Sequence, residues 1–287
     1  MKLGVLVSGN LGYIFLKDIF KKQIVVFVFT DSKSENIIQF CELNNIELFI
    51  GNPKSIDSKK FYSNKEIDVL VSVNYLFLIE LDLIMLPKIL SFNIHGSLLP
   101  KYRGRTPHVW AIINNEIKTG ITAHIIDEGC DTGDILEQFE IEIGKKDTGA
   151  DVLLKFNENY ITLIDSVLKK IESNSLIRTK QNDKEATYFG KRTPEDGHVI
   201  WDWQKERIYN WIRAQAYPYP GAFTYFLKNK IIIDEIEMSN YGFDYSMPNG
   251  LIISVDPILV KTSNGVIKIN KIRNNSNLNL KVGDILK

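Results

Sequence analysis

An alternation of short apolar runs and helical patterns between residues 3 and 95 most constrains the fold of this chain. The apolar runs have the length and the β-branched composition of buried strands, and turn signals or helical spacings follow them. Strands that alternate with helices form a parallel sheet covered on both faces. The sequence therefore predicts an α/β fold with a Rossmann-like, mostly parallel, doubly wound sheet. The expected strands are Leu3–Ser8, Ile24–Thr30, Glu47–Ile50, Ile67–Val73 and Leu90–His95, and the expected helices are Leu11–Phe20 and Ser34–Asn44.

The pattern changes in the second half of the chain. Two further strands, Ile121–Asp127 and Ile135–Ile143, are expected at the sheet edge, and the amphipathic helix Ala150–Ser173 would close the first domain. A helix is expected over Trp201–Ala216, and only short strands with turn signals follow. We therefore expect a catalytic domain over residues 1–180, a connecting segment with a helix over 181–221, and a small antiparallel β domain over 222–287.

Composition limits the classes of partner. The 287 residues include 35 basic and 35 acidic side chains, for a formal net charge of +0. This balance argues against a general nucleic-acid or membrane-surface binder, because both need a basic excess. Cys41 and Cys130 form no disulfide framework or metal pattern, the first residues resemble a strand and not a signal peptide, and no run is long enough to span a membrane. We therefore expect a cytoplasmic protein without a metal.

The segment from Phe92 to Leu136 contains the residues best suited to catalysis. Asn93 and His95 are two residues apart at the end of an expected strand, so they point to the same face, and Asp131 lies in a following acidic loop. A neutral imidazole can accept a proton, a carboxylate can orient it, and an amide can stabilise oxygen charge at a carbonyl. This set suits acyl-group transfer without a covalent enzyme intermediate, although a buried structural histidine beside a loop-capping aspartate would have the same spacing.

Two sequence blocks resemble a known superfamily. NIHGSLLPKYRG followed by GITAHIIDEGCDTGDIL resembles the signature of formyltransferases that use N10-formyltetrahydrofolate. KRTPEDGHVIWDW, the later YPYPGAF segment and GRTPHVWAIIN resemble the branch that acts on dTDP-linked amino-deoxy sugars. The fixed positions of the first pattern are Asn93, His95, Ser97, Leu99, Pro100, Arg103, Gly104, Asp127, Gly129, Asp131, Thr132 and Gly133.

The resemblance implies an enzyme that moves a formyl group from N10-formyltetrahydrofolate, its co-substrate, to the amine of a dTDP-linked amino-dideoxyhexose. dTDP-4-amino-4,6-dideoxyglucose would be the acceptor, for O-antigen or other surface-polysaccharide synthesis. It assigns catalysis to Asn93, His95 and Asp131. Related sugar enzymes are commonly dimers, so a homodimer is expected, with nucleotide sugar and folate as its small-molecule partners.

Residues that would bind the two substrates are expected near the catalytic set. In the family, the loop that corresponds to Asn74, Tyr75, Leu76 and Phe77 binds the pterin largely through its backbone, and Asp127 and Glu128 would meet the pterin edge or cap their own loop. The turn before the first helix and the basic loop after Pro100 are suited to the sugar and its pyrophosphate. Two aromatic residues are candidates for stacking on a base, although such residues more often belong to a core. The candidate sugar-nucleotide ligands are Ser8, Gly9, Asn10, Arg103, Arg105, Trp110 and Tyr219.

Several alternatives stay open at this point. Methionyl-tRNA formylation would need a basic surface for the acceptor stem, which the zero net charge disfavours. A non-catalytic folate- or nucleotide-binding module would not need the complete catalytic set. His108, His124 and His198 show no metal-ligand spacing and are expected to be structural or surface residues.

Overall fold

A computed structural model describes residues 1–273 and 278–287, and it divides the chain into two compact units. The first unit consists of Met1–Gly104, Gly120–Ile141 and Lys155–Tyr188, and the second of Arg105–Thr119, Glu142–Leu154 and Phe189–Lys287. Each unit is therefore made of several separate stretches of the sequence. The expected boundaries at residues 180 and 221 assumed continuous segments, whereas the chain passes between the units several times.

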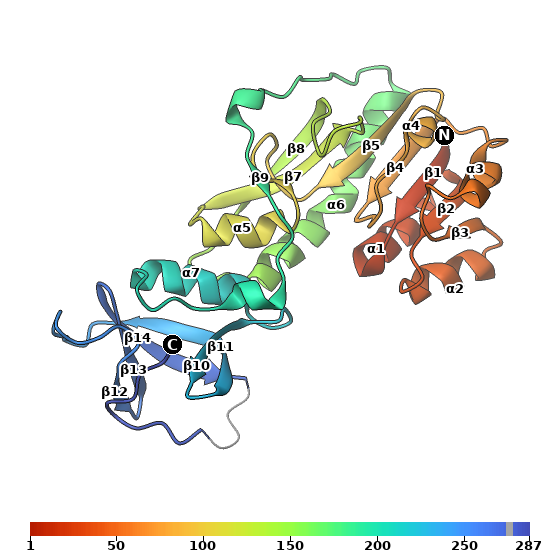
Figure 1. The fold of residues 1–287 in the computed structure, drawn as a ribbon. Coiled ribbons are helices and arrows are strands. Elements are labelled where there is room, and N and C mark those ends of the chain that lie inside the picture. The colour runs from red at the N-terminus through yellow and green to blue at the C-terminus, as the bar shows by residue number, and fades with distance from the viewer. Residues whose placement is uncertain (274–277) are drawn as a thin grey trace. The chain divides into compact units, whose positions relative to one another are not determined.

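The first unit is built on a seven-stranded sheet with the order β3-β2-β1-β4-β5-β7-β8 (Figure 1). The strands from β3 to β5 are parallel, and β7 pairs antiparallel with β5. The mostly parallel doubly wound sheet is thus confirmed. Its strands are β1 (Lys2–Val7), β2 (Ile24–Thr30), β3 (Glu47–Ile50), β4 (Val69–Val73), β5 (Leu90–His95), β7 (Lys118–Ile125) and β8 (Ile135–Glu142).

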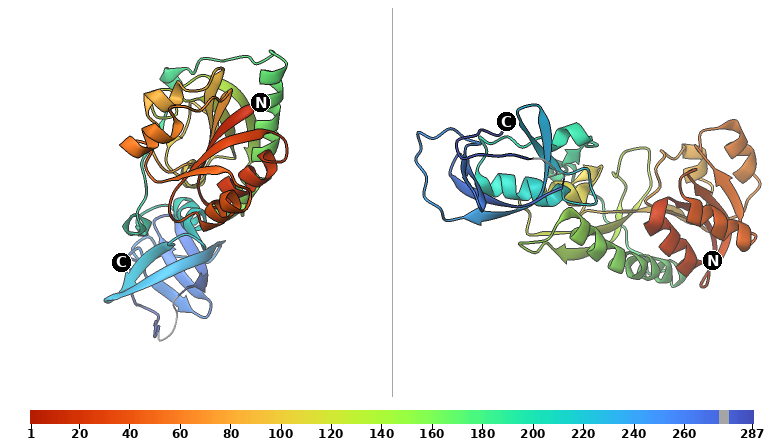
Figure 2. Two further views of the ribbon diagram at one scale, coloured as in Figure 1. Left: turned by 90° about the vertical axis from the view of Figure 1, so that its right-hand side faces the viewer. Right: turned by 90° about the horizontal axis from the view of Figure 1, so that it is seen from below.

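Helices cover both faces of this sheet, as Figure 2 shows in its left-hand view. The strand order reverses direction after β3, and right-handed crossovers on either side of that reversal place their helices on opposite faces. Lys22, just after the first helix, forms an ion pair with Asp165 of the long helix α6, so these two helices share a face. The helices are α1 (Gly9–Ile19), α2 (Glu35–Leu43), α3 (Ile56–Tyr62), α4 (Leu81–Ile84) and α6 (Gly149–Glu172).

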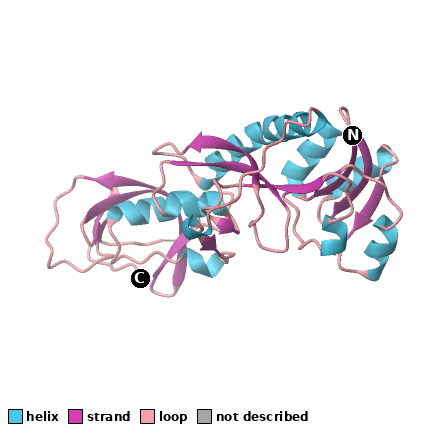
Figure 3. Ribbon diagram, turned by 90° about the horizontal axis from the view of Figure 1, so that it is seen from above, coloured by secondary structure: helices cyan, strands magenta, loops and turns pink. Residues whose placement is uncertain are grey.

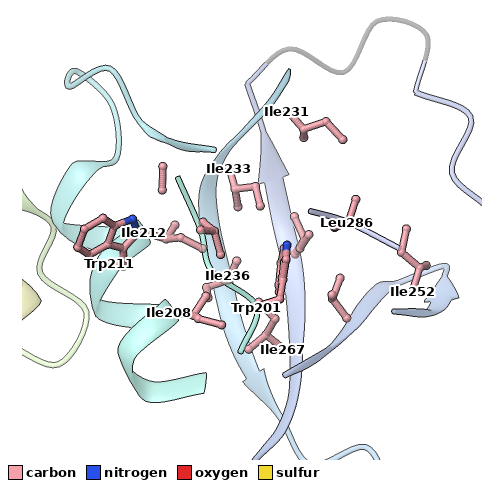
Figure 4. Close-up of a cluster of buried hydrophobic side chains, with 14 residues drawn as sticks. Trp201, Ile208, Trp211, Ile212, Ile231, Ile233, Ile236, Ile252, Ile267 and Leu286 are labelled. Carbon is pink, nitrogen blue, oxygen red and sulfur yellow. The ribbon is translucent and has the colours of Figure 1, made fainter. Parts of the chain in front are cut away.

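The second unit contains a five-stranded antiparallel sheet with the order β10-β11-β14-β13-β12. Trp201, Ile208 and Ile212 pack with isoleucines of this sheet into one buried cluster (Figure 4). Because the cluster joins helix α7 to the sheet, both share one core. The elements are α5 (Pro107–Ile113), α7 (Lys205–Gln215), β10 (Ala222–Phe226), β11 (Asn229–Ser239), β12 (Ile252–Val255), β13 (Ile258–Thr262) and β14 (Gly265–Ile272).

Some short elements were not expected from the sequence. The strands β6 (Arg103–Gly104) and β9 (Tyr188–Phe189) form a two-stranded sheet, and the 3-10 turns Asp183–Glu185 and Pro194–Gly197 flank β9. Loops connect the helices and strands throughout the chain (Figure 3). Helices α3, α4 and α5 were also missed, since each has seven residues or fewer and too few turns for a clear periodicity. No helix within residues 1–273 and 278–287 has both the length and the apolar character to span a bilayer.

The aromatic core beside β2 gives a test of the first unit. Phe27 is 0% exposed and its ring contacts Phe29 and Phe61 edge-on. We expect Phe27→Ala to lower the free energy of unfolding by about 3–5 kcal/mol, because it removes a buried ring and leaves a cavity. Urea denaturation followed by circular dichroism would measure the loss. Ile24→Ala, on the same strand but 63% exposed, is the matched control and should change stability by about 0.5 kcal/mol or less; equal losses in both variants would contradict this view of the core.

Candidate active site

Three neighbouring parallel strands place polar residues at their carboxyl ends. β4 lies between β1 and β5, and Ser8, Asn74 and the pair Asn93 and His95 stand at or after the ends of these strands. The amide of Asn74 donates to the carbonyl oxygen of Ser8 at 3.0 Å, which ties two of the strand ends together. Ligands of open α/β sheets bind at this edge, next to the point where the strand order reverses. A ligand-binding site of the first unit is therefore expected at the carboxyl ends of these strands.

The ring of His95 is held by two groups. Its Nε2 lies 2.8 Å from the carbonyl oxygen of Tyr102, and its Nδ1 lies 3.5 Å from Oδ1 of Asp131. A carbonyl oxygen can only accept, so Nε2 carries a proton and donates it. In the neutral ring Nδ1 is then the basic nitrogen, and it faces a carboxylate that can stabilise the charged form. The Tyr102 carbonyl thus fixes the tautomer, while Asp131 lies beside the nitrogen that can take up a proton.

Asp131 is held in an unusual backbone conformation. Its φ of 57° is in the left-handed region, which few residues other than glycine adopt. Its Oδ2 accepts the N–H of Gly104 at 2.9 Å, and its Oδ1 also lies 3.6 Å from Nε2 of His124. Burial alone would raise the pKa of this carboxyl, but His124, His95 and the Gly104 N–H together hold the pKa well below its usual range. Asp131 is therefore a carboxylate throughout the physiological pH range.

Asn93 is oriented by a histidine of the neighbouring strand. Asn93 on β5 and His124 on β7 are direct partners in the antiparallel ladder, and Asn93 Nδ2 lies 3.2 Å from His124 Nε2. His124 Nδ1 lies 2.8 Å from the Ile125 carbonyl, which can only accept, so Nδ1 carries a proton, and Nε2 faces both the Asn93 amide and Asp131. An amide nitrogen has two protons, so the second N–H of Asn93 can donate to an oxygen in the site. Asn93, His95 and Asp131 thus all lie next to the His124 ring.

The electrostatics of His95 suit a proton acceptor. Burial lowers the pKa of His95 below its ordinary value of 6.5, and the opposing effects of Asp131 and of the Tyr102 carbonyl do not cancel this. The ring is therefore neutral at pH 7. A neutral imidazole beside a fixed carboxylate and an oriented amide can accept a proton from a nucleophile while the amide stabilises charge on an oxygen.

The residues expected to bind folate lie on exposed loops of the same unit. The side chains of Asn74 and Leu76 are exposed, whereas the rings of Tyr75 and Phe77 contact each other edge-on. Asp127 Oδ1 accepts from the Gly129 N–H at 3.1 Å and from the Thr132 hydroxyl at 2.7 Å, which is the loop-capping role. Glu128 beside it is exposed. Their contact with a pterin stays a prediction.

The expected sugar-nucleotide ligands of the first unit have different surroundings. Ser8 is buried at the start of α1, whereas Gly9 and Asn10 are exposed and border an open hollow that Lys33 and Ser34 also line. Arg103 is only 1% exposed, and its guanidinium group donates to Gln181, Tyr188 and Asp183. A phosphate contact stays a prediction for all four residues. The guanidinium group of Arg103 is therefore already hydrogen-bonded to other side chains of the protein.

The other three expected ligands belong to the second unit. Arg105 is exposed. The Trp110 ring contacts Phe189 at a centroid distance of 5.0 Å and the Arg192 guanidinium, also at 5.0 Å, and its Nε1 donates to the carbonyl oxygen of Gly190. The Tyr219 hydroxyl lies 2.8 Å from Nε2 of His108, and burial raises the pKa of Tyr219 to about 12. Stacking of either ring on a base stays a prediction.

Residues that the sequence did not single out complete the site. His124, Tyr102 and Gln181 each contact one of the three candidate catalytic residues. His124 could have been found by pairing the expected strands, because it lies opposite Asn93. Tyr102 acts through its backbone carbonyl, which every residue has, so its identity carries no signal. Gln181 acts through its side chain, but it lies 50 residues beyond Asp131 in the sequence. Within residues 1–273 and 278–287, no cluster of three or more histidine, cysteine, aspartate or glutamate residues could hold a metal.

The protonation of His95 is directly testable. Since its pKa is lower in the folded chain than in the unfolded one, the unfolded chain binds more protons as the pH falls below about 6.5, and stability should decrease there. Nitrogen-15 NMR should show a neutral His95 ring at pH 7, with Nε2 protonated. Asp131→Asn should lower the pKa of His95 further, because the carboxylate favours the charged ring. A pKa that rises in Asp131→Asn would contradict the pairing.

Comparisons with known proteins agree with this geometry. A formyl transferase family model matches residues 5–168, and a model of the formyl transferase C-terminal domain matches residues 191–287. The bifunctional polymyxin resistance protein ArnA of Wigglesworthia glossinidia brevipalpis is 33% identical over 279 residues. That alignment covers 94% of this chain and 42% of the relative, so the chain spans less than half the length of the relative.

Solved structures share the fold. An N-formyltransferase from Helicobacter canadensis, solved with folinic acid and dTDP-3-aminofucose, has a TM-score of 0.73 at 24% identity over 94% of this chain and 99% of its own. A 4-N formyltransferase from Francisella tularensis has a TM-score of 0.69 at 24% identity over 81% of this chain and 96% of its own. The two family models together cover most of the sequence, including every residue of the catalytic set. This chain is a member of the formyl transferase family.

Proposed function

We propose that this enzyme moves a formyl group from N10-formyltetrahydrofolate to the amine of a dTDP-linked amino-dideoxyhexose. The convergence of Asn93, His95 and Asp131 carries the proposal, since it supplies an amide donor, a neutral base and a fixed carboxylate. Within this proposal dTDP-4-amino-4,6-dideoxyglucose is the acceptor, the product serves O-antigen or other surface-polysaccharide synthesis, and the enzyme works in the cytoplasm as a homodimer.

The loops at the strand ends suit a pterin. The 2-aminopyrimidine edge of a pterin offers N–H donors, which carboxylates and carbonyl oxygens accept. Asp127 and Glu128 are exposed beside Asp131, and the loop Asn74–Phe77 offers backbone groups at the end of β4. Folate would supply an activated formyl group, and the protein would hold it next to the acceptor amine. The folinic acid bound by the Helicobacter canadensis neighbour supports this choice of co-substrate.

The catalytic set would act at the moment of attack. The neutral sugar amine attacks the formyl carbon, and the amide of Asn93 donates to the formyl oxygen as negative charge develops on it. Nδ1 of His95 accepts a proton from the amine, directly or through a water molecule. The Asp131 carboxylate, 3.5 Å away, stabilises the resulting imidazolium. The proton then passes to the departing N10 nitrogen as its bond to the formyl carbon breaks, so the base is regenerated.

Two structural neighbours and the sequence blocks bear on the identity of the sugar. One structural neighbour carries dTDP-3-aminofucose and another is a 4-N formyltransferase, so both amine positions occur among proteins with this fold. The sequence blocks around Arg105 and Trp110 favour a dTDP-linked sugar through their resemblance to that branch. The zero net charge favours a small molecule over tRNA.

A panel assay tests the acceptor. The enzyme would be incubated with N10-formyltetrahydrofolate and each of several dTDP-, UDP- and GDP-linked 3-amino and 4-amino deoxy sugars, with initiator Met-tRNA alongside. We expect one dTDP-linked amino sugar to be formylated far faster than the rest, as measured by mass spectrometry of the product. Turnover of Met-tRNA alone would refute the sugar assignment, and tight folate binding without transfer to any amine would indicate a non-catalytic module.

The proposed base can be removed by mutation. We expect His95→Asn to lower kcat by roughly 10²–10⁴-fold, because a general base typically contributes that much, with a smaller change in KM. Steady-state kinetics with the preferred sugar would measure both constants. His198→Asn, which makes the same change in the second unit, is the matched control and should keep the wild-type rate. Near-normal turnover in His95→Asn would rule out His95 as the base.

A further inference from the structure

Arg103 and Gln181 form a buried, hydrogen-bonded pair next to the loop that carries Asp131. Gln181 is 6% exposed, and its Oε1 accepts from Arg103 Nε at 3.1 Å and from Arg103 Nη2 at 2.7 Å. The same guanidinium group also donates to Asp183 at 2.9 Å and to the Tyr188 hydroxyl. A planar guanidinium held at several of its donors has one orientation. Its partner Gln181 is therefore fixed as well.

The other end of Gln181 reaches the loop that carries Asp131. Gln181 Nε2 donates to the carbonyl oxygen of Asp131 at 2.9 Å and to that of Gly133 at 2.7 Å. The amide nitrogen of Gln181 thus donates to two carbonyl oxygens of one loop, and the amide oxygen accepts from Arg103. A buried amide with all these groups satisfied is a rigid connector.

The Asp131 loop has a conformation that needs such a connector. Asp131 has a φ of 57°, and this left-handed backbone is unfavourable for an aspartate unless its surroundings impose it. Gly133 runs so close to the carbonyl of Ile125 that a Cβ would lie 2.0 Å from that oxygen. The loop therefore follows one tight path, and the two hydrogen bonds from Gln181 lie on either side of Thr132 within it.

The backbone on either side of Arg103 is hydrogen-bonded to both Asp131 and His95. Gly104, the residue after Arg103, donates its N–H to the Asp131 carboxylate at 2.9 Å, and Tyr102, the residue before it, accepts from His95. Thr187 in turn accepts the N–H groups of Tyr102 at 2.8 Å and Arg103 at 2.9 Å. The segment that begins at Gln181 thus holds the backbone partners of both His95 and Asp131.

We propose that Gln181 is a positioning residue for catalysis, which places the Asp131 carboxylate against His95 through its bonds to the loop and to Arg103. The expected effect on kcat rests on the proposed formyl transfer. The placement of Asp131 against His95 does not depend on which acceptor is used. It also gives Arg103 a role within the protein, as the partner that holds the Gln181 amide oxygen.

Three variants test the proposal by kinetics. Gln181→Ala removes the whole connector, whereas Gln181→Glu keeps an oxygen for Arg103 and loses the N–H groups that face the loop. Ser91→Ala is the control, because Ser91 is 4% exposed in the same unit and its hydroxyl makes a 2.6 Å hydrogen bond to Ile84, away from Asp131. We expect both Gln181 variants to lose about 10²-fold in kcat with little change in KM for the sugar, since misplacement by about 1 Å has that effect. Ser91→Ala should keep the wild-type kcat even if its melting temperature falls by as much as that of the Gln181 variants.

A second readout needs no substrate. His95 faces Asp131, His124 and the Tyr102 carbonyl, so its titration reports where the carboxylate lies. In Gln181→Ala the pKa of His95 should fall, because Asp131 moves away, while His108 in the second unit serves as the internal reference. If Gln181→Ala does not fold, Gln181→Glu carries both measurements.

The outcomes separate the two proposals. A wild-type enzyme that formylates no amine refutes the proposed function, and the His95 titration then decides the positioning role alone. A wild-type enzyme that is active, with Gln181 variants whose kcat matches that of Ser91→Ala and whose His95 titration is unchanged, overturns the role of Gln181.

Discussion

The Asp131 carboxylate between two imidazole rings is the interaction on which the rest of the site depends. A buried charge is costly unless other groups stabilise it, and here the Gly104 N–H and the rings of His95 and His124 surround it. In the proposed reaction the carboxylate would stabilise the charged form of His95, whereas burial keeps that ring neutral before the reaction. One ion thus connects the end of β5, the loop after β7 and strand β6.

The sheet explains why these groups meet. Neighbouring strands β5 and β7 run antiparallel, so the register that pairs Asn93 with His124 also pairs His95 with Thr122. Asn93 and His95, the two candidate catalytic residues of β5, therefore share a face with their partners on β7. The Asp131 loop must fold back over this face, and its left-handed residue and its close glycine contact at Gly133 are the local features that allow it.

Much of the fold and the centre of the site could be predicted from the sequence. The apolar runs gave β2 and β5 with their observed bounds, because buried parallel strands leave a strong local pattern. Asn93, His95 and Asp131 were identifiable by chemistry and by family resemblance. The division into units was not predictable, because it depends on which distant stretches pack together. The surroundings of Arg103 were also missed, since a basic loop residue and a buried guanidinium look alike until Gln181, far along the chain, is placed beside it.

In the proposed reaction His95 and Asp131 act as one unit, and a double-mutant cycle on formyl transfer tests this most directly. The kcat of His95→Asn, of Asp131→Asn and of the double variant would be measured with the same acceptor. Residues that act as a unit have strongly non-additive effects, so the double variant should be about as slow as His95→Asn alone. Losses that multiply in the double variant would show that the two side chains contribute independently and would contradict this account.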